Sequence, residues 1–507
     1  MNRKYLIAAI AIVIIIGAGA FALSNTSNTS SGSASVNVDA SALEDMGNIV
    51  VNASEDSKQK GLISSSSSDL NSILVTNNGK LTLSDSLINK TGDTATSGDD
   101  ADFYGVNSAV LVNTNGTLEI SNCEIITDSK GSNGIFVTNA EASSSGDSSQ
   151  GGQPSEVPGG DSQGGDGGQP PEMPSGEGSG DGGQAPEAGG SGGGDPSGAS
   201  DASGTTVANI KNVKITTHSD KSRGLDATYN GIINAENVVI NTDGQSCAAL
   251  ATDRGDGQVH VTNSEINTGV SKTSGRGSPL IYSTGNITAE NTKGTAYVSQ
   301  IACIEGKNSI ELVNCDLTGY AEGNRQDGST YVDLGGVFIY QSMSGDADVG
   351  TSLFTAKNSK LTIPSDSPVY SEAPMFHVTN TACIINLENT ELSFGSGVFI
   401  EVSSQNQWGT TGSNGGAAEL NTNNEKIEGN VIVDEISSLV WNMTNTEFNG
   451  AINSTGNTTV NVDSGSTWTL TGDSSVSNLT VSGTINYGNY KLTVNGKTYD
   501  SSNPFKG

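Results

Sequence analysis

The sequence contains few aromatic residues, few charged residues and especially few basic residues. Phe, Trp and Tyr make up 5% of the 507 residues and charged residues 15%, and 23 Lys and Arg stand against 55 Asp and Glu, a formal net charge of -32. Because phosphate binding requires clustered Lys and Arg, this balance argues against nucleic acids and anionic membrane surfaces as partners. The low aromatic and charged content, with abundant Gly, Ser, Thr and Asn, predicts repetitive β-structure rather than compact α/β domains.

Cysteine is scarce and is not arranged for covalent or metal chemistry. The five cysteines are scattered, their number is odd and none forms a C-x-x-C pair; they are Cys123, Cys247, Cys303, Cys315 and Cys383. This pattern excludes a disulfide framework and a zinc site. We expect these side chains to be small apolar fillers of a stacked core.

The sequence has one long hydrophobic run, at its N-terminus. Arg3 and Lys4 precede an uncharged apolar run over residues 5–23, which is just long enough to span a bilayer as a helix. Basic residues before the run and none soon after it place the N-terminus in the cytoplasm and the rest outside. A cleaved signal is the alternative, because residues 20–22 (AFA) resemble a cleavage site. Residues 1–24 are therefore predicted to be a cell-membrane anchor or a signal, and both interpretations predict export.

Two stretches have low sequence complexity. Residues 25–47 are rich in Ser, Thr and Asn and are predicted to form a flexible stalk. Residues 141–204 contain no Lys or Arg and almost no large apolar residue, so they cannot bury a core and are predicted to be disordered. Repeats lie on both sides of this Gly/Pro/acidic segment. We therefore expect it to be a loop extruded from one coil rather than a boundary between unrelated domains.

The rest of the chain repeats one phrase: two apolar residues one apart, then Asn, a small residue and another apolar residue. The clearest copies are residues 118–125 (LEISNCEI), 233–240 (INAENVVI), 259–266 (VHVTNSEI) and 310–317 (IELVNCDL). From Asn212 to Asn314 successive copies of the phrase are about 25 residues apart. A second alternating phrase, such as residues 224–227, precedes most copies. Each period therefore holds at least two short strands separated by turns.

This repeat predicts an all-β fold, a right-handed parallel β-helix solenoid with an N-terminal transmembrane helix. Coils stacked about 4.8 Å apart pair each strand with its counterparts and align the inward Ile, Val and Leu side chains. Asn tolerates left-handed backbone, so we expect it in tight turns, where stacked Asn side chains could bond as a ladder. The first coils are predicted over 48–140, the main β-helix over 205–426, and narrower coils with a cap over 427–507. An array of β-sandwiches is the alternative, but its period would be about 90–100 residues.

The residues resemble a known group of surface proteins. The Asn-centred coils resemble right-handed parallel β-helix repeats of the pectate-lyase-like type. Residues 464–473 (SGSTWTLTGD) and 492–497 (LTVNGK) resemble the C-terminal region of adhesin-like surface proteins of methanogenic archaea and gut bacteria. The resemblance covers most of the chain beyond residue 48. It implies a cell-surface role in which surface glycans or other cells are the partners.

A polysaccharide lyase or glycoside hydrolase is the rival interpretation. A lyase requires several carboxylates around a calcium ion and a base, and a hydrolase requires two opposed carboxylates. Charged residues about one period apart would stack on one face, and those placed in this way are Arg223, Arg254, Arg276, Asp253 and Asp256. Charged residues on exposed turns are the simpler explanation, so no catalytic residue is assigned.

Two acidic residues could bind calcium. Asp346 and Asp348 lie one residue apart, but they lack the full spacing of a defined calcium loop. Exposed turns are therefore favoured, and no metal site or other cofactor is assigned.

The sequence as a whole favours an adhesin-like protein that presents a β-helical rod for attachment to glycans or other cells. It leans away from an enzyme, and a purely structural envelope role is the third interpretation.

Overall fold

The computed structural model describes most of the chain beyond its first 37 residues. The described ranges are 38–96, 98–140, 204–273, 275–323, 325–326, 330–331, 333–342, 344–405 and 413–506. The predicted anchor, most of the predicted stalk and residues 141–203 of the predicted disordered segment lie outside these ranges. Within the described ranges, no helix is both long enough and apolar enough to cross a membrane.

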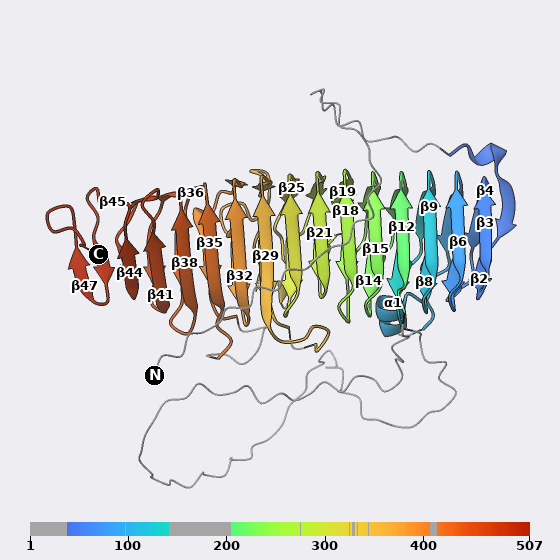
Figure 1. Ribbon diagram of the computed structural model, residues 1–507, viewed down its shortest axis with the longest axis horizontal. Coiled ribbons are helices and arrows are strands. Elements are labelled where there is room, and N and C mark those ends of the chain that lie inside the picture. Colours follow the sequence, from blue (N-terminus) through green and yellow to red (C-terminus); the bar gives the residue numbers. More distant parts are fainter. Residues whose placement is uncertain are drawn as a thin grey trace, which may run out of the picture. The chain divides into compact units, whose positions relative to one another are not determined.

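The described residues form stacked coils whose strands line up in three long sheets, A, B and C (Figure 1). All strand pairs within these three sheets are parallel, as the repeat predicts for a β-helix solenoid. In spatial order, sheet A consists of β1 (Glu44–Gly47), β4 (Gly61–Ser65), β7 (Leu87–Thr91), β10 (Glu124–Asp128), β13 (Lys214–Thr217), β16 (Val239–Thr242), β19 (Glu265–Thr268), β22 (Lys293–Ala296), β25 (Asp316–Gly319), β30 (Lys360–Thr362) and β33 (Glu391–Ser393).

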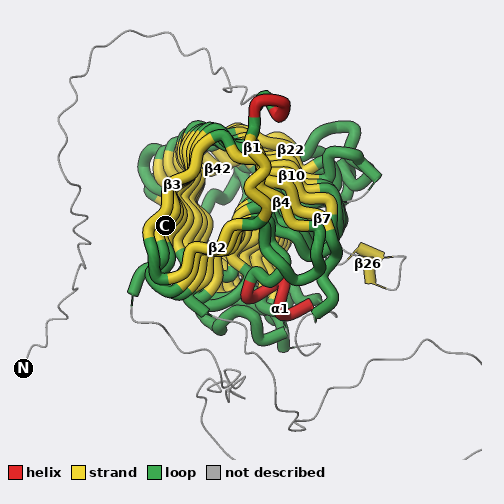
Figure 2. Tube along the Cα trace, turned by 90° about the vertical axis from the view of Figure 1, so that its right-hand side faces the viewer, coloured by secondary structure: helices red, strands yellow, loops and turns green. Residues whose placement is uncertain are grey.

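Sheets B and C are the two other long sheets of the stack. Sheet B consists of β2 (Ile49–Asn52), β5 (Ile73–Thr76), β8 (Val110–Asn113), β11 (Ile135–Thr138), β14 (Leu225–Thr228), β17 (Leu250–Thr252), β20 (Ile281–Ser283), β23 (Ala302–Glu305), β28 (Val337–Tyr340), β31 (Phe376–Thr379), β34 (Val398–Val402), β37 (Asn430–Val433) and β40 (Ile452–Ser454). Sheet C consists of β3 (Glu55–Gln59), β6 (Lys80–Ser84), β9 (Thr117–Ser121), β12 (Val207–Lys211), β15 (Ile232–Glu236), β18 (Gln258–Thr262), β21 (Asn286–Glu290), β24 (Ser309–Val313), β29 (Thr351–Lys357), β32 (Ala382–Glu388), β35 (Ala417–Asn423), β38 (Ser438–Thr444), β41 (Asn457–Val462) and β44 (Asn478–Val481). Viewed along the stack, the three sheets enclose a common interior (Figure 2).

The last coils are shorter and end in a hairpin. A four-stranded sheet holds β36 (Lys426–Glu428), β39 (Glu447–Asn449), β42 (Thr467–Thr469) and β45 (Thr484–Asn486). A three-stranded sheet holds β43 (Ser474–Val476), β46 (Leu492–Val494) and β47 (Lys497–Tyr499), and its last two strands are antiparallel. In this hairpin β47 pairs with the edge of β46 that would otherwise be open for edge-to-edge pairing.

Side chains alternate between the interior and the outer surface along the strands. In sheet C, one inward position forms an uninterrupted row of buried apolar side chains, namely Leu81, Leu118, Ala208, Ile233, Val259, Ile287, Ile310, Phe354, Ile385, Leu420, Trp441 and Val460. Burial of each large member contributes about 1.5–3 kcal/mol. The predicted inward rows of Ile, Val and Leu are therefore present. All five cysteines are also buried and form no disulfide. Cys123, Cys315 and Cys383 lie in the apolar interior, as predicted for small core fillers, whereas Cys303 packs in a separate cluster with Phe338 and Tyr340.

The Asn of the repeated phrase occupies the turn that follows each sheet C strand from β9 to β38. These residues adopt a left-handed backbone, with φ of 53° at Asn212 and 54° at Asn237. The Nδ2 of Asn237 donates to the Oδ1 of Asn212 at 2.7 Å, and Asn314 donates to Asn291 at 3.1 Å. The predicted Asn ladder is confirmed, and each amide both sets its own turn and ties it to the preceding coil.

A short helix and several loops interrupt the repeat. Helix α1 (Gly98–Tyr104) lies between β7 and β8 and packs on the outer side of sheet B (Figure 2). Its seven residues are too few to show a helical period in the sequence, which predicted no helix beyond the anchor. A 3-10 turn, η1 (Ala40–Ala42), precedes the first coil, and β26 (Arg325–Gln326) and β27 (Thr330–Tyr331) form a small antiparallel pair.

Candidate functional sites

On the outer surface of sheet C, one register position is occupied by a polar side chain on every strand. A single outward register position forms this row, which we call the polar row: Ser57, Thr82, Glu119, Asn209, Asn234, His260, Thr288, Glu311, Thr355, Asn386, Asn421, Asn442, Asn461 and Thr480. Parallel pairing without a register shift keeps these side chains at a spacing of about 4.8 Å. The surface is therefore a regular array of hydrogen-bonding groups along the stack.

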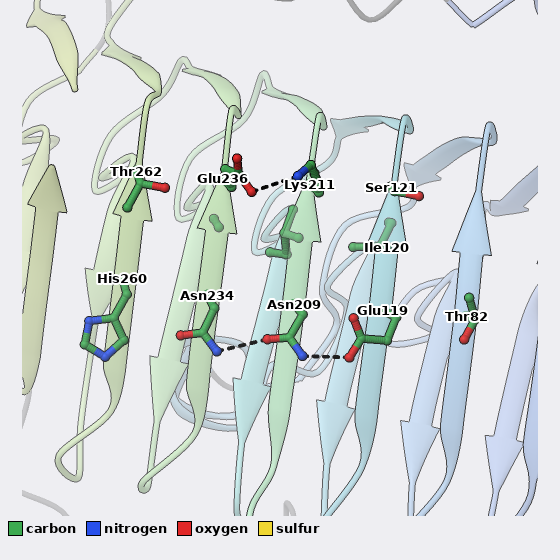
Figure 3. Close-up of a pocket in the computed structure, with 12 residues that line it drawn as sticks. Thr82, Glu119, Ile120, Ser121, Asn209, Lys211, Asn234, Glu236, His260 and Thr262 are labelled. Atoms are coloured by element: carbon green, nitrogen blue, oxygen red, sulfur yellow. Dashed lines mark hydrogen bonds and ion pairs between the residues drawn. The ribbon is translucent and has the colours of Figure 1, made fainter. Parts of the chain in front are cut away.

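A shallow groove of about 510 Å³ lies over part of the polar row (Figure 3). Within it, the Nδ2 of Asn209 donates to Glu119 Oε1 at 2.7 Å, and the Nδ2 of Asn234 donates to Asn209 Oδ1 at 2.9 Å. The imidazole of His260 follows Asn234 on the next strand, and burial lowers its pKa. The imidazole is therefore uncharged at neutral pH, with one ring nitrogen that donates and one that accepts.

The same arrangement of amides recurs near the C-terminus. The Nδ2 atoms of Asn421, Asn442 and Asn461 each donate to the Oδ1 atom of the preceding Asn, at 3.0, 2.8 and 2.8 Å. A side-chain amide has two N–H groups and two acceptor lone pairs. Asn442 uses one of each within the row and retains a donor and an acceptor for a ligand that lies along sheet C. The second N–H of Asn421 instead donates to Glu419 Oε1 at 3.1 Å.

A second site, the charged pocket, lies on the outer side of sheet B and has a volume of about 250 Å³. The side chains that define it are Asp102, Phe103, Arg223, Asp253, Tyr282, Tyr340 and Asp346. They come from α1, from the segments before β14 and after β17, from β20 and β28, and from the loop after β28. This pocket is therefore assembled across several coils, from α1 to the coil of β28, by segments that depart from the repeat.

Arg223 lies at the centre of a buried ion cluster in this pocket. Its Nη1 is 2.5 Å from Asp102 Oδ1, its Nη2 is 2.9 Å from Asp253 Oδ2, and its Nε is 4.0 Å from Asp226 Oδ2. Lys221 adds a second cation at 2.8 Å from Asp102. An isolated buried charge would be very costly, so each ion in this cluster depends on the others.

The ion cluster shifts the acidity of its carboxyl groups in opposite directions. Burial, and then the neighbouring charge of Asp253, raise the pKa of Asp226 well above its ordinary value. Burial also raises the pKa of Asp253, although Arg223 opposes the shift. Burial alone would raise the pKa of Asp102, but the charges and hydrogen bonds of Arg223 and Lys221 outweigh it and the pKa is lowered. Asp226 and Asp253 therefore form a buried pair in which one proton is readily retained.

A second arginine closes one side of the charged pocket. The guanidinium carbon of Arg254 lies 3.8 Å from the centroid of the Phe103 ring, and its Nη2 pairs with Asp346. On another wall, the hydroxyl of Tyr282 donates to Glu305 at 2.8 Å. These contacts fix the side chains around the opening before any ligand arrives.

The structure brings together only some of the residues predicted from the sequence. Arg223 contacts Asp253 directly, whereas Asp256 lies in a separate ion pair, 3.5 Å from Lys307. Arg254 follows β17 and pairs with Asp346. Arg276 is exposed and does not line the charged pocket, although the adjacent Gly277 does.

The two acidic residues considered for calcium are each paired with a cation. Asp346 contacts Arg254, and Asp348 lies 2.8 Å from Lys307 Nζ. Across the described ranges, no group of three or more His, Cys, Asp and Glu side chains is placed to hold a metal ion.

Sequence reasoning missed several walls of the charged pocket. The sequence assigns none of Asp102, Phe103, Tyr282 and Tyr340 to a site. No spacing signal connects these residues, because α1 and the loop after β28 are insertions into the repeat. Only the alternating pattern of β20 and β28 could have placed the two tyrosines on the outer side of a strand.

No family model matches the chain, and comparisons with curated proteins and with solved structures found no match either. The resemblance to adhesin-like and pectate-lyase-like proteins therefore stays a prediction.

Proposed function

We propose that this chain is a cell-surface, adhesin-like protein that binds glycans along the outer surface of sheet C. The observation that carries the proposal is the polar row, in which every strand of sheet C presents one hydrogen-bonding side chain at the same outward position. A polymer of similar repeating units can contact many such positions at once, so weak individual contacts add up to useful avidity.

The chemistry of the polar row favours hydroxyl-rich ligands. Side-chain amides such as those of Asn234 and Asn442 offer a donor and an acceptor together, and sugar hydroxyl groups can satisfy both. The formal net charge of -32 disfavours polyanionic chains through long-range repulsion. We therefore infer a neutral polysaccharide as the ligand.

The N-terminal sequence supports placement at the cell surface. Residues 5–23 are apolar and follow Arg3 and Lys4, a pattern typical of an exported protein that keeps a membrane anchor. We propose that this segment holds the protein at the membrane while the solenoid faces the exterior.

Retention of the purified 507-residue chain by neutral polysaccharides tests the proposal. A triple variant, Asn209→Ala, Asn234→Ala and His260→Ala, removes three members of the groove. Each lost contact is worth about 0.5–1.5 kcal/mol, so we expect affinity to fall at least about tenfold, which corresponds to about 1.4 kcal/mol.

The matched control is the double variant Asn241→Ala and Asn267→Ala. These two residues form the same kind of amide hydrogen bond, at 3.1 Å, on the outer surface of sheet A. The control should bind as the unmodified chain does. Equal losses in both variants, or no retention by any polysaccharide, would contradict a binding role for sheet C, and the second result would favour a purely structural envelope protein.

A polysaccharide lyase or glycoside hydrolase is the second candidate function. It rests on the buried carboxyl pair of Asp226 and Asp253 beside Arg223, since a carboxyl group that keeps its proton can act as a general acid. Release of reducing or unsaturated sugar ends that is abolished in Asp253→Asn would support this function. Retention of polysaccharide without product would support binding alone.

A further inference from the structure

At the charged pocket the fold departs from its repeat on several coils at once. Helix α1 and the loop that carries Asp346 are both insertions, and they meet over sheet B. Arg254 lies against Phe103 of the helix and pairs with Asp346 of the loop. The insertions thus converge on one pocket rather than extending separately into solvent.

The polar walls of the charged pocket are held rigidly. Arg223 is nearly buried, and its guanidinium is divided between Asp102 and Asp253 at 2.5 and 2.9 Å. A carboxylate can accept several hydrogen bonds, so each of these two groups retains acceptor capacity toward the pocket after it binds Arg223. Preorganised acceptors of this kind bind a ligand without an ordering cost.

Aromatic rings complete the walls. Phe103, Tyr282 and Tyr340 line the pocket together with its carboxylates. The hydroxyl of Tyr282 is anchored on Glu305, so its ring is fixed in orientation. Aromatic faces pack against the C–H surface of a small ring, and the carboxylates accept hydrogen bonds from hydroxyl groups at its edge.

The balance of charges selects among small hydroxylated ligands. Three carboxylates line the pocket, those of Asp102, Asp253 and Asp346, against one lining guanidinium, that of Arg223. Arg223 is already engaged with Asp102 and Asp253. The two neighbouring cations are engaged as well, Arg254 with Asp346 and Lys221 with Asp102. An acidic ligand would therefore have to displace one of these carboxylates before it could pair with a cation. A neutral ligand avoids this cost.

We propose that the charged pocket is a second carbohydrate site, which takes a single neutral sugar residue and rejects its uronic acid counterpart. This site is independent of the polar row, because the two lie on different sheets. A sugar can therefore bind in the charged pocket whether or not sheet C binds a polysaccharide.

Calorimetric titration of the purified 507-residue chain with paired ligands tests this inference. The pairs are methyl glucoside with glucuronic acid and methyl galactoside with galacturonic acid. We expect saturable binding of at least one neutral glycoside and at least tenfold weaker binding of the acid with the same ring configuration. The absence of saturable binding by either neutral glycoside would overturn the proposal, as would equal binding of an acid.

Variants on one loop provide a matched comparison. Asp346→Ala removes a lining carboxylate, whereas Asp348→Ala removes a carboxylate that is largely exposed and pairs with Lys307 outside the pocket. We expect at least a tenfold loss of glycoside binding in the first and no change in the second. Equal effects would show that the pocket is not the site.

Two further variants separate this site from the polar row and from misfolding. Phe103→Ala should weaken glycoside binding at least tenfold, with the circular dichroism spectrum and thermal midpoint showing whether the solenoid is intact. The triple variant in the groove of sheet C should bind the glycoside normally even where it has lost polysaccharide. A loss of glycoside binding in that triple variant would assign the sugar to sheet C and overturn the inference.

Discussion

The Nη1 atom of Arg223 lies 2.5 Å from the Oδ1 atom of Asp102, although 121 residues separate the two in the chain. Asp102 belongs to α1, which leaves the repeat between β7 and β8, and Arg223 precedes β14. Their ion pair therefore connects α1, which is inserted before β8, to the coil of β14, two strands further along sheet B. Asp253 is the second partner of Arg223.

Replacement of Arg223 should be strongly destabilising. Arg223→Gln leaves the buried carboxylates of Asp102 and Asp253 without their counter-charge, and removal of one partner from a buried ion pair costs about 3–5 kcal/mol. We expect a clear fall in the thermal and urea midpoints of unfolding. Arg276→Gln is the control, because Arg276 is exposed and surface changes usually stay within about 0.5 kcal/mol. Similar midpoints for the two variants would contradict a structural role for the ion cluster.

The left-handed turn at Asn237 predicts that the protein is most stable with Asn at this position, less stable with Gly and least stable with Ala. Asn237→Ala loses the 2.7 Å hydrogen bond to Asn212, and Ala tolerates the left-handed backbone at this position, with φ of 54°, less well than Asn does. The strain and the lost bond together cost about 2 kcal/mol. Asn237→Gly loses only the bond, so its thermal midpoint should lie between those of the Ala variant and the unmodified chain. An Ala variant as stable as the Gly variant would show that strain at this turn is unimportant.

Aromatic side chains pack against one another in the interior of the C-terminal coils, and replacement of the central one, Trp441, should lower the free energy of unfolding strongly. Trp441 is fully buried, with ring centroids 5.8 Å from Phe399 and 4.7 Å from Phe448. Trp441→Ala should cost about 3–5 kcal/mol, and Trp441→Phe should cost less because most of the packing is kept. Val440→Ala, on the exposed side of the same strand, should leave the denaturation midpoint nearly unchanged. A small effect of Trp441→Ala would indicate that the interior repacks without it.

Glu425 predicts a pH dependence of stability. Burial raises the pKa of Glu425 from its usual value near 4.5 to about 7, while its Oε1 accepts a hydrogen bond from the Thr390 backbone N–H at 2.8 Å. Between these two pH values the folded chain binds more protons than the unfolded chain. The stability that this group contributes is therefore full below pH 4.5 and is lost as the pH rises through about 7.

The variant Glu425→Gln tests this linkage. Glutamine keeps the acceptor for Thr390 and carries no charge, so at pH 8 the variant should be more stable by about 1–2 kcal/mol. At pH 4 the two proteins should have similar thermal midpoints. A variant that is no more stable at pH 8 would mean that the carboxylate is better solvated than its burial implies.

The repeated features of the fold were predictable from the sequence because each depends on local chemistry. Asn122, Asn237 and Asn314 recur after an apolar pair, and the tolerance of Asn for left-handed backbone indicates a turn at each. Strand alternation then fixes which side chains enter the interior, as with Leu118 and Ile233. These are short-range rules applied many times, so the stacking, the Asn ladder and the apolar core follow.

The charged pocket was only partly predictable because loop length governs it. Arg223 and Asp253 could be placed on one face by their spacing, but Arg276 could not. Between Leu250 and Ile281, which are paired in the structure, the loop is longer than in the preceding coils and displaces Arg276 from the repeat. The approach of Asp102 to Arg223 depends on where α1 returns, and no period in the sequence encodes that path.

The contacts of α1 also bear on how the solenoid would fray. Each coil of a repeat array is held mainly by its immediate neighbours, so opening can start at an end and advance one coil at a time. The contacts from Asp102 to Arg223, and from Phe103 through Arg254 to Asp346, connect coils that are not adjacent. These contacts hold together the coils from β8 to β28. A protein pulled at one end while attached along its side would thus keep its middle coils closed after its terminal coils had begun to peel.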